Sequence, residues 1–503
     1  MTGLLARIFG ASLWEALLTL FVLASSIFTA ILFTLPSSYT PYAEERINLD
    51  DFDADEFTDP DSGYLYIQRS EKDSTKGNPT TSVVVFVLGD IGRSPRMQYH
   101  ALSIAKYGGR VDLVGYTDSE VLPEIKKHKL IRVVSLTPVP NGLKADSKAM
   151  FVLLAPLKVM FQAWTIYQAL GYQTHPRKFI LVQNPPSIPT LVIAQIVCMI
   201  RNTKLVVDWH NLGHTILALK MGEKHALVKA SEAYERGVAQ WAHKNITVSN
   251  AMTRRLNQEY GIEAHAMHDR PARQFRPIDT TERSAILHKL AQTQPHTKSI
   301  MNGKRRLVVS STSWTADEDF SLLLDALVAY SATVAMNPKL PQVTVVITGK
   351  GPLKDYYMDK IAKLNKSKKL SCVEVHTAWL TMEEYALLLG AADLGVSLHT
   401  SSSGVDLPMK VVDMFGAGLP VVGWDKFEAW PELVQEGVNG RGFQNAEGLE
   451  RLLEELFRQD GARLSKLRRG ALEESKRRWE HEWPKVARLF DIRLEGESEE
   501  TKV

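Results

Sequence analysis

Residues 82–100 read SVVVFVLGDIGRSPRMQYH, and this stretch predicts a buried strand followed by a glycine loop and a helix. The run from Ser82 to Leu88 is rich in β-branched residues and shows no polar alternation. Such a run is typical of a parallel strand that is buried on both faces. Further strands are predicted at 111–116, 131–134, 179–183 and 204–208, with helical stretches between them. This alternation predicts βαβ units around a parallel sheet.

A second α/β series follows the polar stretch 279–306, which we interpret as a connection between domains. The series has predicted strands at 307–311, 343–348, 373–376 and 394–398, and predicted helices at 320–336 and from Pro408. We therefore predict an α/β fold with two Rossmann-like domains. The first covers residues 81–278 and the second covers 307–480, followed by a C-terminal helix and tail at 481–503.

Composition excludes several classes of protein. The 503 residues are 45% hydrophobic and 23% charged, which is ordinary for a globular chain. A net charge of +3 is too small to indicate nucleic-acid binding. The two cysteines, Cys198 and Cys372, cannot form a disulfide framework and have no metal-ligand spacing. Most of the chain is therefore expected in a reducing compartment.

The N-terminal part is predicted to meet a membrane. Residues 16–35 carry no charged side chain, and about 1.5 Å per residue gives roughly the thickness of a hydrocarbon core. We predict one retained transmembrane helix there, behind a short tail at 1–15; a cleaved signal peptide is the alternative. Residues 36–80 are predicted to be an acidic, flexible tether. The apolar helices predicted at 150–172 and 188–200 suit either buried helices or a membrane surface.

Two loops of the second half are candidate nucleotide sites, because ligands of open α/β sheets bind at the carboxyl ends of the strands. In the first, Gly349-Lys350-Gly351, small residues would let a nucleotide approach the backbone. The second, residues 399–408, is rich in hydroxyls and precedes a helix whose N-terminus favours a diphosphate. A plain turn and a serine-rich cap are the alternatives. On that helix, Lys410 could pair with phosphate and Asp413 could accept ribose hydroxyls.

The first half has its own candidate residues at strand ends. Asp90 lies in the glycine loop after the first strand, where it could be a catalytic base or a helix cap. His210, in Asp208-Trp-His-Asn211, is the second candidate base, with a capping or core role as the alternative. The glycine loop matches neither a Walker loop nor a full Gly-x-Gly-x-x-Gly fingerprint.

These motifs together resemble the two-domain GT-B glycosyltransferases, in particular the dolichol-pathway β-mannosyltransferases that add the first mannose. The resemblance covers about residues 80–460. It rests on the motifs at 89–97, 208–211, 269–271, 310–315 and 402–415. It implies two domains facing a cleft and a donor, GDP-mannose, whose mannose passes to dolichyl-diphosphate chitobiose in an inverting β1,4 transfer. It also implies a place on the endoplasmic reticulum membrane, with the catalytic domains facing the cytosol.

This chain departs from GT-B relatives at two places. Of the two glutamates that such relatives often carry, the second is kept here as Asp413. The first position is Val405, so that carboxylate is either lost or displaced by one residue to Asp406. Retaining relatives tend to carry an Arg and a Lys after the strand that opens the second domain, where this chain has Asp317, Glu318 and Asp319. Both departures fit a different stereochemical course.

From the residues and the resemblance we predict three sets of site residues. Asp90 is the first choice of base and His210 the second. Residues for the acceptor and its phosphates are Gly89, Gly92, Arg93 and Arg270. Donor residues are Ser313, Gly349, Lys350, Gly351, Trp379, Ser402, Ser403, Gly404, Lys410 and Asp413.

No metal site is predicted, and no cofactor is required structurally, although a divalent cation could stimulate turnover. Expected partners are membrane lipid and other dolichol-pathway mannosyltransferases, and not nucleic acid. Two alternatives stay open: a membrane-tethered GT-B transferase with another nucleotide sugar, and a non-catalytic GT-B-like scaffold subunit.

Overall fold

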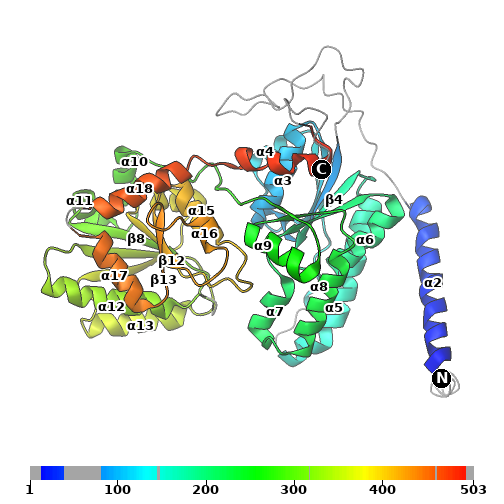
Figure 1. Cartoon of the computed structure of the whole chain (residues 1–503), viewed down its shortest axis with the longest axis horizontal. Coiled ribbons are helices and arrows are strands. Elements are labelled where there is room, and N and C mark those ends of the chain that lie inside the picture. The colour runs from blue at the N-terminus through cyan, green and yellow to red at the C-terminus, as the bar shows by residue number, and fades with distance from the viewer. Residues whose placement is uncertain (1–12, 39–80, 144–147, 316–317, 459–460, 494–503) are drawn as a thin grey trace, which may run out of the picture. The chain divides into compact units, whose positions relative to one another are not determined.

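The computed structural model describes residues 13–38, 81–143, 148–315, 318–458 and 461–493, and it contains two parallel sheets flanked by helices (Figure 1). The predicted α/β class is therefore confirmed. Most of the predicted tail 1–15 and tether 36–80 lies outside the described residues.

The first sheet has the strand order β3-β2-β1-β4-β5-β6-β7. Its central strand is the one predicted from the opening motif, and Val85 in it pairs with Leu113 on one side and Leu181 on the other. The five predicted strands are present, and two short ones were missed because they are only four and two residues long. The bounds are β1 Ser82–Asp90, β2 Arg110–Tyr116, β3 Ile131–Ser135, β4 Phe179–Asn184, β5 Lys204–Trp209, β6 Lys244–Thr247 and β7 His265–Ala266.

The helices of this part of the chain follow the predicted alternation. The helix predicted at 150–172 is α5, which continues into the π-helix η5, and the helix predicted at 188–200 is α6. The bounds are α2 Leu13–Ser38, η3 Ile91–Arg93, α3 Pro95–Lys106, α4 Pro123–Lys127, η4 Asn141–Leu143, α5 Lys148–Gln168, η5 Ala169–Gln173, α6 Thr190–Arg201, α7 Gly213–Met221, α8 Ala226–Ala239, α9 Asn250–Arg255 and η6 Leu256–Tyr260.

Within the described residues, no helix combines the length and the apolarity that crossing a bilayer requires.

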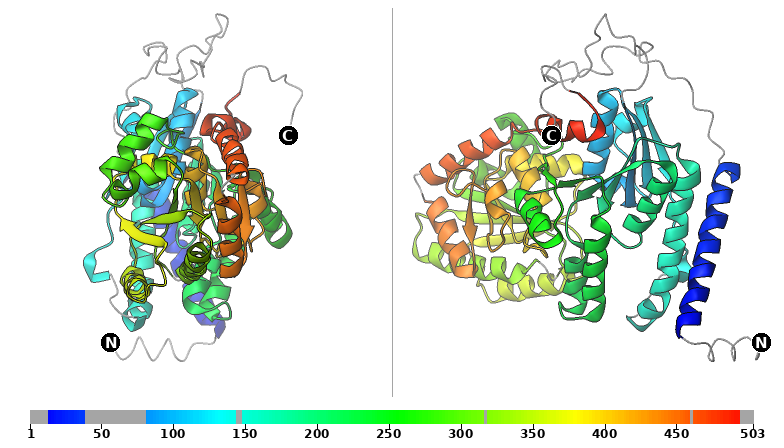
Figure 2. Two further views of the ribbon diagram at one scale, coloured as in Figure 1. Left: turned by 90° about the vertical axis from the view of Figure 1, so that its left-hand side faces the viewer. Right: turned by 45° about the vertical axis from the view of Figure 1, so that its right-hand side comes forward.

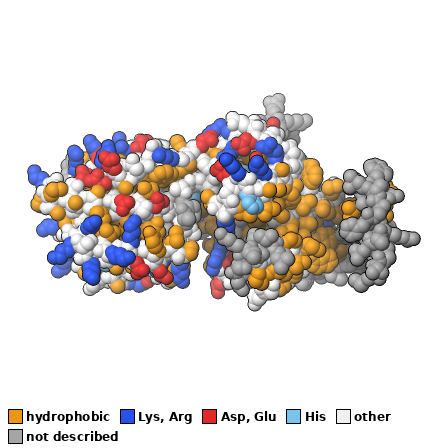
Figure 3. All heavy atoms as spheres, turned by 90° about the horizontal axis from the view of Figure 1, so that it is seen from below, with side chains coloured by type: hydrophobic (Ala, Val, Ile, Leu, Met, Phe, Trp, Pro, Cys, Tyr) orange, Lys and Arg blue, Asp and Glu red, His pale blue; other side chains and the backbone are white. Residues whose placement is uncertain are grey.

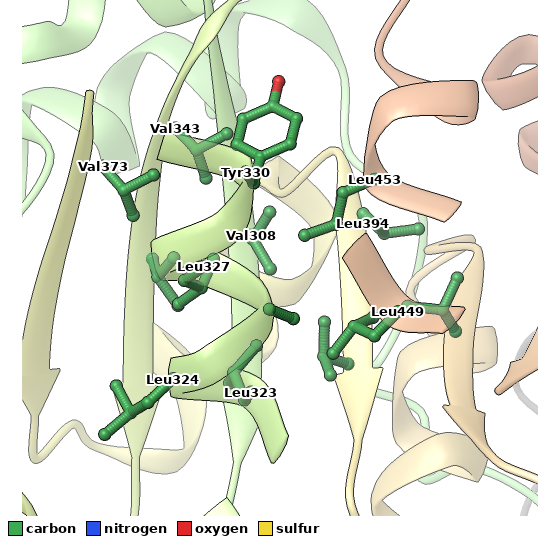
Figure 4. Close-up of a cluster of buried hydrophobic side chains, with 14 of the residues drawn as sticks. Val308, Leu323, Leu324, Leu327, Tyr330, Val343, Val373, Leu394, Leu449 and Leu453 are labelled. Atoms are coloured by element: carbon green, nitrogen blue, oxygen red, sulfur yellow. The ribbon is translucent and has the colours of Figure 1, made fainter. Parts of the chain in front are cut away.

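The second sheet has the order β10-β9-β8-β11-β12-β13. Helix α12, predicted at 320–336, lays Leu323, Leu327 and Tyr330 on the sheet, where Val308 and Val343 meet them (Figure 4). The leucines of α17 extend the same core. The bounds are β8 Arg305–Ser311, α12 Phe320–Met336, β9 Gln342–Thr348, α13 Lys354–Lys366, β10 Val373–Ala378, α14 Met382–Ala391, β11 Leu394–Ser397, α15 Met409–Gly416, β12 Val421–Trp424, α16 Trp430–Leu433, β13 Gly440–Phe443 and α17 Ala446–Leu456.

The stretch predicted as a connection is largely helical. Asp279 and Glu282 form a capping box at the start of α10 (Thr280–Lys289), and Ile286 and Leu287 of that helix are buried. Helix α11 (Thr297–Met301) follows before β8 begins at Arg305. The polar composition hid these helices because only one narrow side of α10 is apolar. The C-terminal region is helical as predicted, in the pieces α18 Ala462–Glu474, α19 Trp479–Glu482, α20 Pro484–Ala487 and η8 Arg488–Phe490.

The described chain forms two compact units. Unit 1 contains the described residues up to Val207, together with 241–243 and 490–492; unit 2 contains 208–240, 244–489 and Arg493. The separate parallel sheets and the helices that flank them can be followed in the two views of Figure 2. In unit 2, β8, β9, β10 and β11 are parallel, so the loops that follow them gather at one edge of the sheet.

Candidate active site

The glycine loop after β9 packs against the loop after β8. A Cβ added to Gly349 would lie 1.8 Å from the carbonyl oxygen of Thr312, and one added to Gly351 would lie 1.7 Å from that of Ser313. The indole of Trp314 donates to the Gly349 carbonyl over 3.3 Å. We predicted that these glycines let a nucleotide approach the backbone. The structure shows that these glycines admit the backbone of the neighbouring loop, and the approach of a nucleotide stays a prediction.

Replacing Gly351 by Ala is therefore expected to destabilise the protein. The added methyl group overlaps a backbone carbonyl, and overpacking of this kind costs about 1–3 kcal/mol. Gly237→Ala is the matched control, because nothing lies within 4 Å of its Cβ position in helix α8. The control is expected to be neutral or slightly stabilising. Urea unfolding of both variants makes the comparison, and equal midpoints would contradict this packing role.

Lys350 and Trp379, both predicted to bind the donor, lie together. The Lys350 ammonium is 3.8 Å from the centroid of the Trp379 indole, within the range of a cation–π interaction. The indole is 65% exposed, which is unusual for so large an aromatic side chain. It follows β10 directly and offers a flat surface on which a nucleobase can stack.

Lys410 and Ser313, two other predicted donor residues, are joined through Glu318. The buried Glu318 carboxylate accepts from the Thr312 hydroxyl and the Ser313 backbone N–H, each at 2.6 Å. It also forms an ion pair with Lys410, whose ammonium donates to the Ser313 hydroxyl over 3.2 Å. Glu318 was missed as a site residue, although its place in an acidic run was the available signal.

The serine loop between β11 and α15 is organised around Asp406. This carboxylate accepts from His399 at 3.0 Å, from Ser403 at 3.1 Å and from Ser401. Burial alone would raise the pKa of Asp406, but the bonds from His399, Ser401 and Ser403 hold it below its usual value. The Gly404 N–H donates to the Ser401 hydroxyl at 2.8 Å. Ser403 and Gly404 therefore shape the loop, and their role as direct phosphate ligands stays a prediction.

Ser402 of the same loop meets the Asp208–Asn211 motif within unit 2. Its hydroxyl accepts from the Asn211 amide at 3.2 Å and lies 3.3 Å from the Thr215 hydroxyl. Ser249 donates to the carbonyl of Val405 in the same loop. These bonds bring together segments that are almost two hundred residues apart in sequence.

His210 is oriented by Asp208. Its Nε2 lies 2.8 Å from the carboxylate of Asp208, which is fully buried at the end of β5. An imidazole that donates Nε2–H to a carboxylate has its lone pair on Nδ1, so the neutral ring can accept a proton there. Trp209 between them is buried and donates to Asn245 over 3.0 Å, which holds the motif in place.

Asp90, the first predicted base, caps a helical turn in unit 1. One oxygen accepts from the backbone N–H of Gly92 at 3.2 Å and of Ser119 at 3.1 Å. Burial alone would raise the pKa of Asp90, but hydrogen bonds from Ser119 and Gly92 and the charge of Arg93 lower it. A base with a lowered pKa takes a proton less readily. The structure shows the capping role of Asp90, and its role as a base stays a prediction.

The other predicted residues of that loop have different surroundings. Gly92 is required by packing, because its Cβ would lie 2.6 Å from the carbonyl of Glu120. At Gly89 the nearest atom would be a Val87 methyl group at 3.5 Å. The Arg93 side chain is 82% exposed and lies 3.4 Å from Asp90, so it remains open to an anionic ligand.

Arg270 is a structural residue. Its guanidinium is almost fully buried and pairs with Glu474 at 2.7 Å and Glu482 at 2.6 Å. Both carboxylates come from the C-terminal helices α18 and α19, about two hundred residues away, and the phosphate contact of Arg270 stays a prediction.

Asp413 lies on α15 close to a second carboxylate. Burial and the neighbouring Asp269 raise the pKa of Asp413 from 3.8 to about 8. Burial, and after it the charge of Asp413, raises the pKa of Tyr385, whose hydroxyl lies 2.8 Å from that of Ser311. A carboxyl group that keeps its proton at neutral pH can both donate and accept, which suits a sugar hydroxyl.

The contribution of Asp413 to the stability of the wild type should fall as pH rises from about 4 to about 8. Across this window the folded state keeps the Asp413 proton and the unfolded chain has lost it. Residue 413 of an Asp413→Asn variant cannot titrate. The unfolding free energy of the variant minus that of the wild type should therefore be larger at pH 8 than at pH 5, by at least about 1 kcal/mol. Denaturant unfolding at several pH values measures this gain. Exposed Asp359→Asn is the control, and a wild-type slope equal to that of Asp413→Asn would contradict the shift.

The described residues contain no group of three or more His, Cys, Asp or Glu side chains arranged to hold a metal ion.

A family model described as "Glycosyl transferases group 1" matches residues 304–459. Curated relatives named chitobiosyldiphosphodolichol beta-mannosyltransferase match most of the chain. The protein from Arthroderma benhamiae is 48% identical over 84% of this chain and 93% of the relative. The mouse protein is 40% identical over 80% of this chain and 87% of the relative. The human protein is 37% identical over 81% of this chain and 92% of the relative.

Solved structures share the fold. Anabaena Alr3699/HepE, in complex with UDP and glucose, is similar with a TM-score of 0.57 at 16% identity, over 82% of this chain and 99% of that one. Sucrose-phosphate synthase from Thermosynechococcus elongatus is similar with a TM-score of 0.55 at 15% identity, over 82% of this chain and 98% of that one. Together with the family model, these similarities confirm the predicted GT-B fold with two parallel sheets.

Proposed function

Because this chain belongs to the chitobiosyldiphosphodolichol beta-mannosyltransferase family, we propose that it transfers mannose from GDP-mannose to dolichyl-diphosphate chitobiose with inversion, forming a β1,4 linkage. The chain is a mannosyltransferase of the dolichol pathway, as the resemblance in its motifs implied. The donor, the linkage and the roles of single residues belong to the proposal.

The observation that carries the proposal is that Asn211 and Thr215 are both hydrogen-bonded to Ser402. These contacts connect the segment that carries His210 to the loop beside the predicted donor residues Lys410 and Asp413. A base and a sugar-nucleotide site in one place are what a single displacement requires.

In the proposed reaction His210 is the base. The acceptor hydroxyl attacks the anomeric carbon of mannose, the bond from that carbon to the GDP oxygen breaks, and the hydroxyl proton passes to Nδ1 of His210. Asp208 fixes the ring and stabilises the imidazolium that forms. Lys410, held by Glu318, offers positive charge to the departing diphosphate, and Asp413 holds the ribose.

The test is a turnover assay with purified full-length protein, GDP-mannose and a phytanyl- or dolichyl-diphosphate chitobiose. We expect the acceptor to gain one hexose in a β1,4 linkage, as read by mass and linkage analysis. Turnover with UDP-sugars in place of GDP-mannose would favour the other donor class. Binding without turnover for every donor would favour the scaffold alternative.

We further propose that turnover needs no divalent cation and takes place at the endoplasmic reticulum membrane, on its cytosolic face. The lipid-linked acceptor of the relatives supports the membrane location. Loss of turnover in EDTA would contradict the first statement. The predicted transmembrane anchor and the predicted association with other mannosyltransferases of the pathway remain proposals, which carbonate extraction and co-purification can test.

A further inference from the structure

Glu235 is a buried carboxylate of unit 2 that the proposed reaction does not use. Charged side chains are spread over the surface seen in Figure 3, whereas that of Glu235, on helix α8, has no exposed area. One of its oxygens accepts from the backbone N–H of Gly213 at 3.0 Å, and the other lies 2.9 Å from Nδ1 of His214. Removing a charge from water is costly, so a buried carboxylate needs partners of this kind. Glu235 and the two residues that it binds therefore hold one another in place.

Tyr260 completes the cluster around Glu235. Its hydroxyl lies 3.5 Å from the carboxylate and 3.4 Å from Nδ1 of His214. Burial, and after it the charge of Glu235, raises the pKa of Tyr260, so the hydroxyl keeps its proton and can donate. The ring of the same tyrosine packs edge-on against that of Trp209, with the ring centroids 6.0 Å apart. Tyr260 thus connects the carboxylate to the Asp208–Asn211 motif.

The two residues that Glu235 binds begin helix α7, which follows this motif. The first N–H groups of a helix have no partner within it. The residue before α7, Leu212, provides no side-chain cap. Glu235 supplies an acceptor from the neighbouring helix α8, and the helix dipole favours a carboxylate at this end. The place of the first turn of α7 therefore depends on Glu235.

This first turn is attached to the residues of the proposed reaction. Two residues separate His210 from Gly213 in the sequence. Thr215 lies 3.3 Å from the Ser402 hydroxyl, to which the Asn211 amide donates over 3.2 Å. A shift at the start of α7 is therefore passed on to the base and to its contact with the serine loop. Misplacing a reacting group by about 1 Å can cost about 10²-fold in rate.

We propose that Glu235 is a positioning residue for the mannosyl transfer. It fixes the start of α7, and thereby the place of His210 and the contacts of Asn211 and Thr215 with Ser402. The proposal rests on the proposed function, in which His210 takes the proton of the acceptor. Glu235 itself binds protein groups and acts through the segment that it anchors. Its loss is expected to lower kcat more than it raises the KM for the donor, because the residue that loses its place is the base.

A disulfide cross-link tests the positioning independently of turnover. Full-length protein with Cys372→Ser receives Thr215→Cys and Ser402→Cys, which replace hydroxyls 3.3 Å apart; the native Cys198 is buried. Diamide oxidises the introduced pair, and mass spectrometry follows the rate. We expect the rate to fall at least about fivefold when Glu235→Leu is added, because the start of α7 no longer keeps its place beside the serine loop. An unchanged rate would overturn the proposal.

Three further variants control this measurement. Glu232→Leu changes a carboxylate of the same helix whose side chain is 40% exposed, and it should leave the rate unchanged. Glu235→Gln should stay within about twofold, because its amide can accept from Gly213 and donate to the other tautomer of His214. If circular dichroism shows that Glu235→Leu does not fold, Glu235→Asp replaces it, since the shorter side chain cannot reach both partners. A wild-type rate with Glu235→Asp would then overturn the proposal.

Turnover links the anchor to the base. Glu235→Leu is expected to lower kcat about 10- to 10²-fold, with less than a threefold change in the KM for the donor. Glu235→Gln and Glu232→Leu should stay within threefold of wild type. When His210→Gln is already present, Glu235→Leu should cost less than about threefold more, because a base that is absent cannot be misplaced.

A full additional loss in the double variant would give Glu235 a role other than positioning His210 and would overturn the proposal. Failure of the proposed function is seen separately, as absent turnover in the wild type. The rate of cross-linking still decides in that case whether Glu235 fixes the start of α7.

Discussion

The variant His210→Gln should turn over about 10²- to 10⁴-fold more slowly than wild type, the range expected when a general base is lost. Glutamine keeps an N–H that can donate to Asp208, so the buried carboxylate retains its partner. What the variant loses is the second ring nitrogen, which accepts the proton in the proposed reaction. Initial rates at saturating GDP-mannose measure kcat, and the KM for donor should change by less than threefold.

Asp90→Asn is the contrasting variant. Asparagine retains an oxygen that can accept from Ser119 and Gly92, and it removes the carboxylate proposed at first as the base. We expect less than a tenfold loss in kcat. The reverse pattern, with a severe loss at Asp90 and a mild one at His210, would return the base role to Asp90.

Replacing Arg270 by Met should lower the unfolding free energy by about 3–5 kcal/mol. Removing one partner of a buried ion pair leaves the other charge buried without compensation, and here Glu474 and Glu482 both lose their partner. Denaturant unfolding followed by circular dichroism measures the loss. Arg270→Lys keeps the charge but not the planar guanidinium with its paired donors. Its unfolding free energy should lie between those of the wild type and Arg270→Met.

Arg254→Met is the matched control for Arg270→Met. Arg254 pairs with Glu428 at 2.8 Å, but both side chains are about half exposed, and such pairs contribute about 0–1 kcal/mol. If Arg270→Lys kept full stability and raised the KM for the lipid diphosphate acceptor, the structural role would be refuted. The predicted phosphate contact would then be restored.

Local sequence pattern was sufficient for the frame of the molecule. The uninterrupted β-branched runs around Val85 and Val308 predicted the centres of both sheets, because a strand covered on both faces has no polar side. Pattern failed where an element is short or polar. The strand at His265 has two residues, and helix α10 buries only Ile286 and Leu287 of its apolar residues.

The roles of the candidate site residues remain predictions. Loops at the carboxyl ends of parallel strands have to converge, which accounts for the contact between Lys350 and Trp379. The hydrogen-bond partner of each polar side chain could not be predicted from the sequence. Asp406 accepts a hydrogen bond from Ser403, whose hydroxyl is predicted to bind phosphate. Glu318 pairs with Lys410, which is 92 residues away in sequence.

Two α/β halves and the motifs of a mannosyltransferase family can be read from the amino-acid order alone, since periodicity and motif spacing are local properties. The partners of the polar side chains become known only from the folded chain. Hydrogen bonds and burial depend on segments that are distant along the chain. The pairing of Arg270 with Glu482 exists only once the chain has folded, as do the burial of Asp413 and its proximity to Asp269, which raise its pKa.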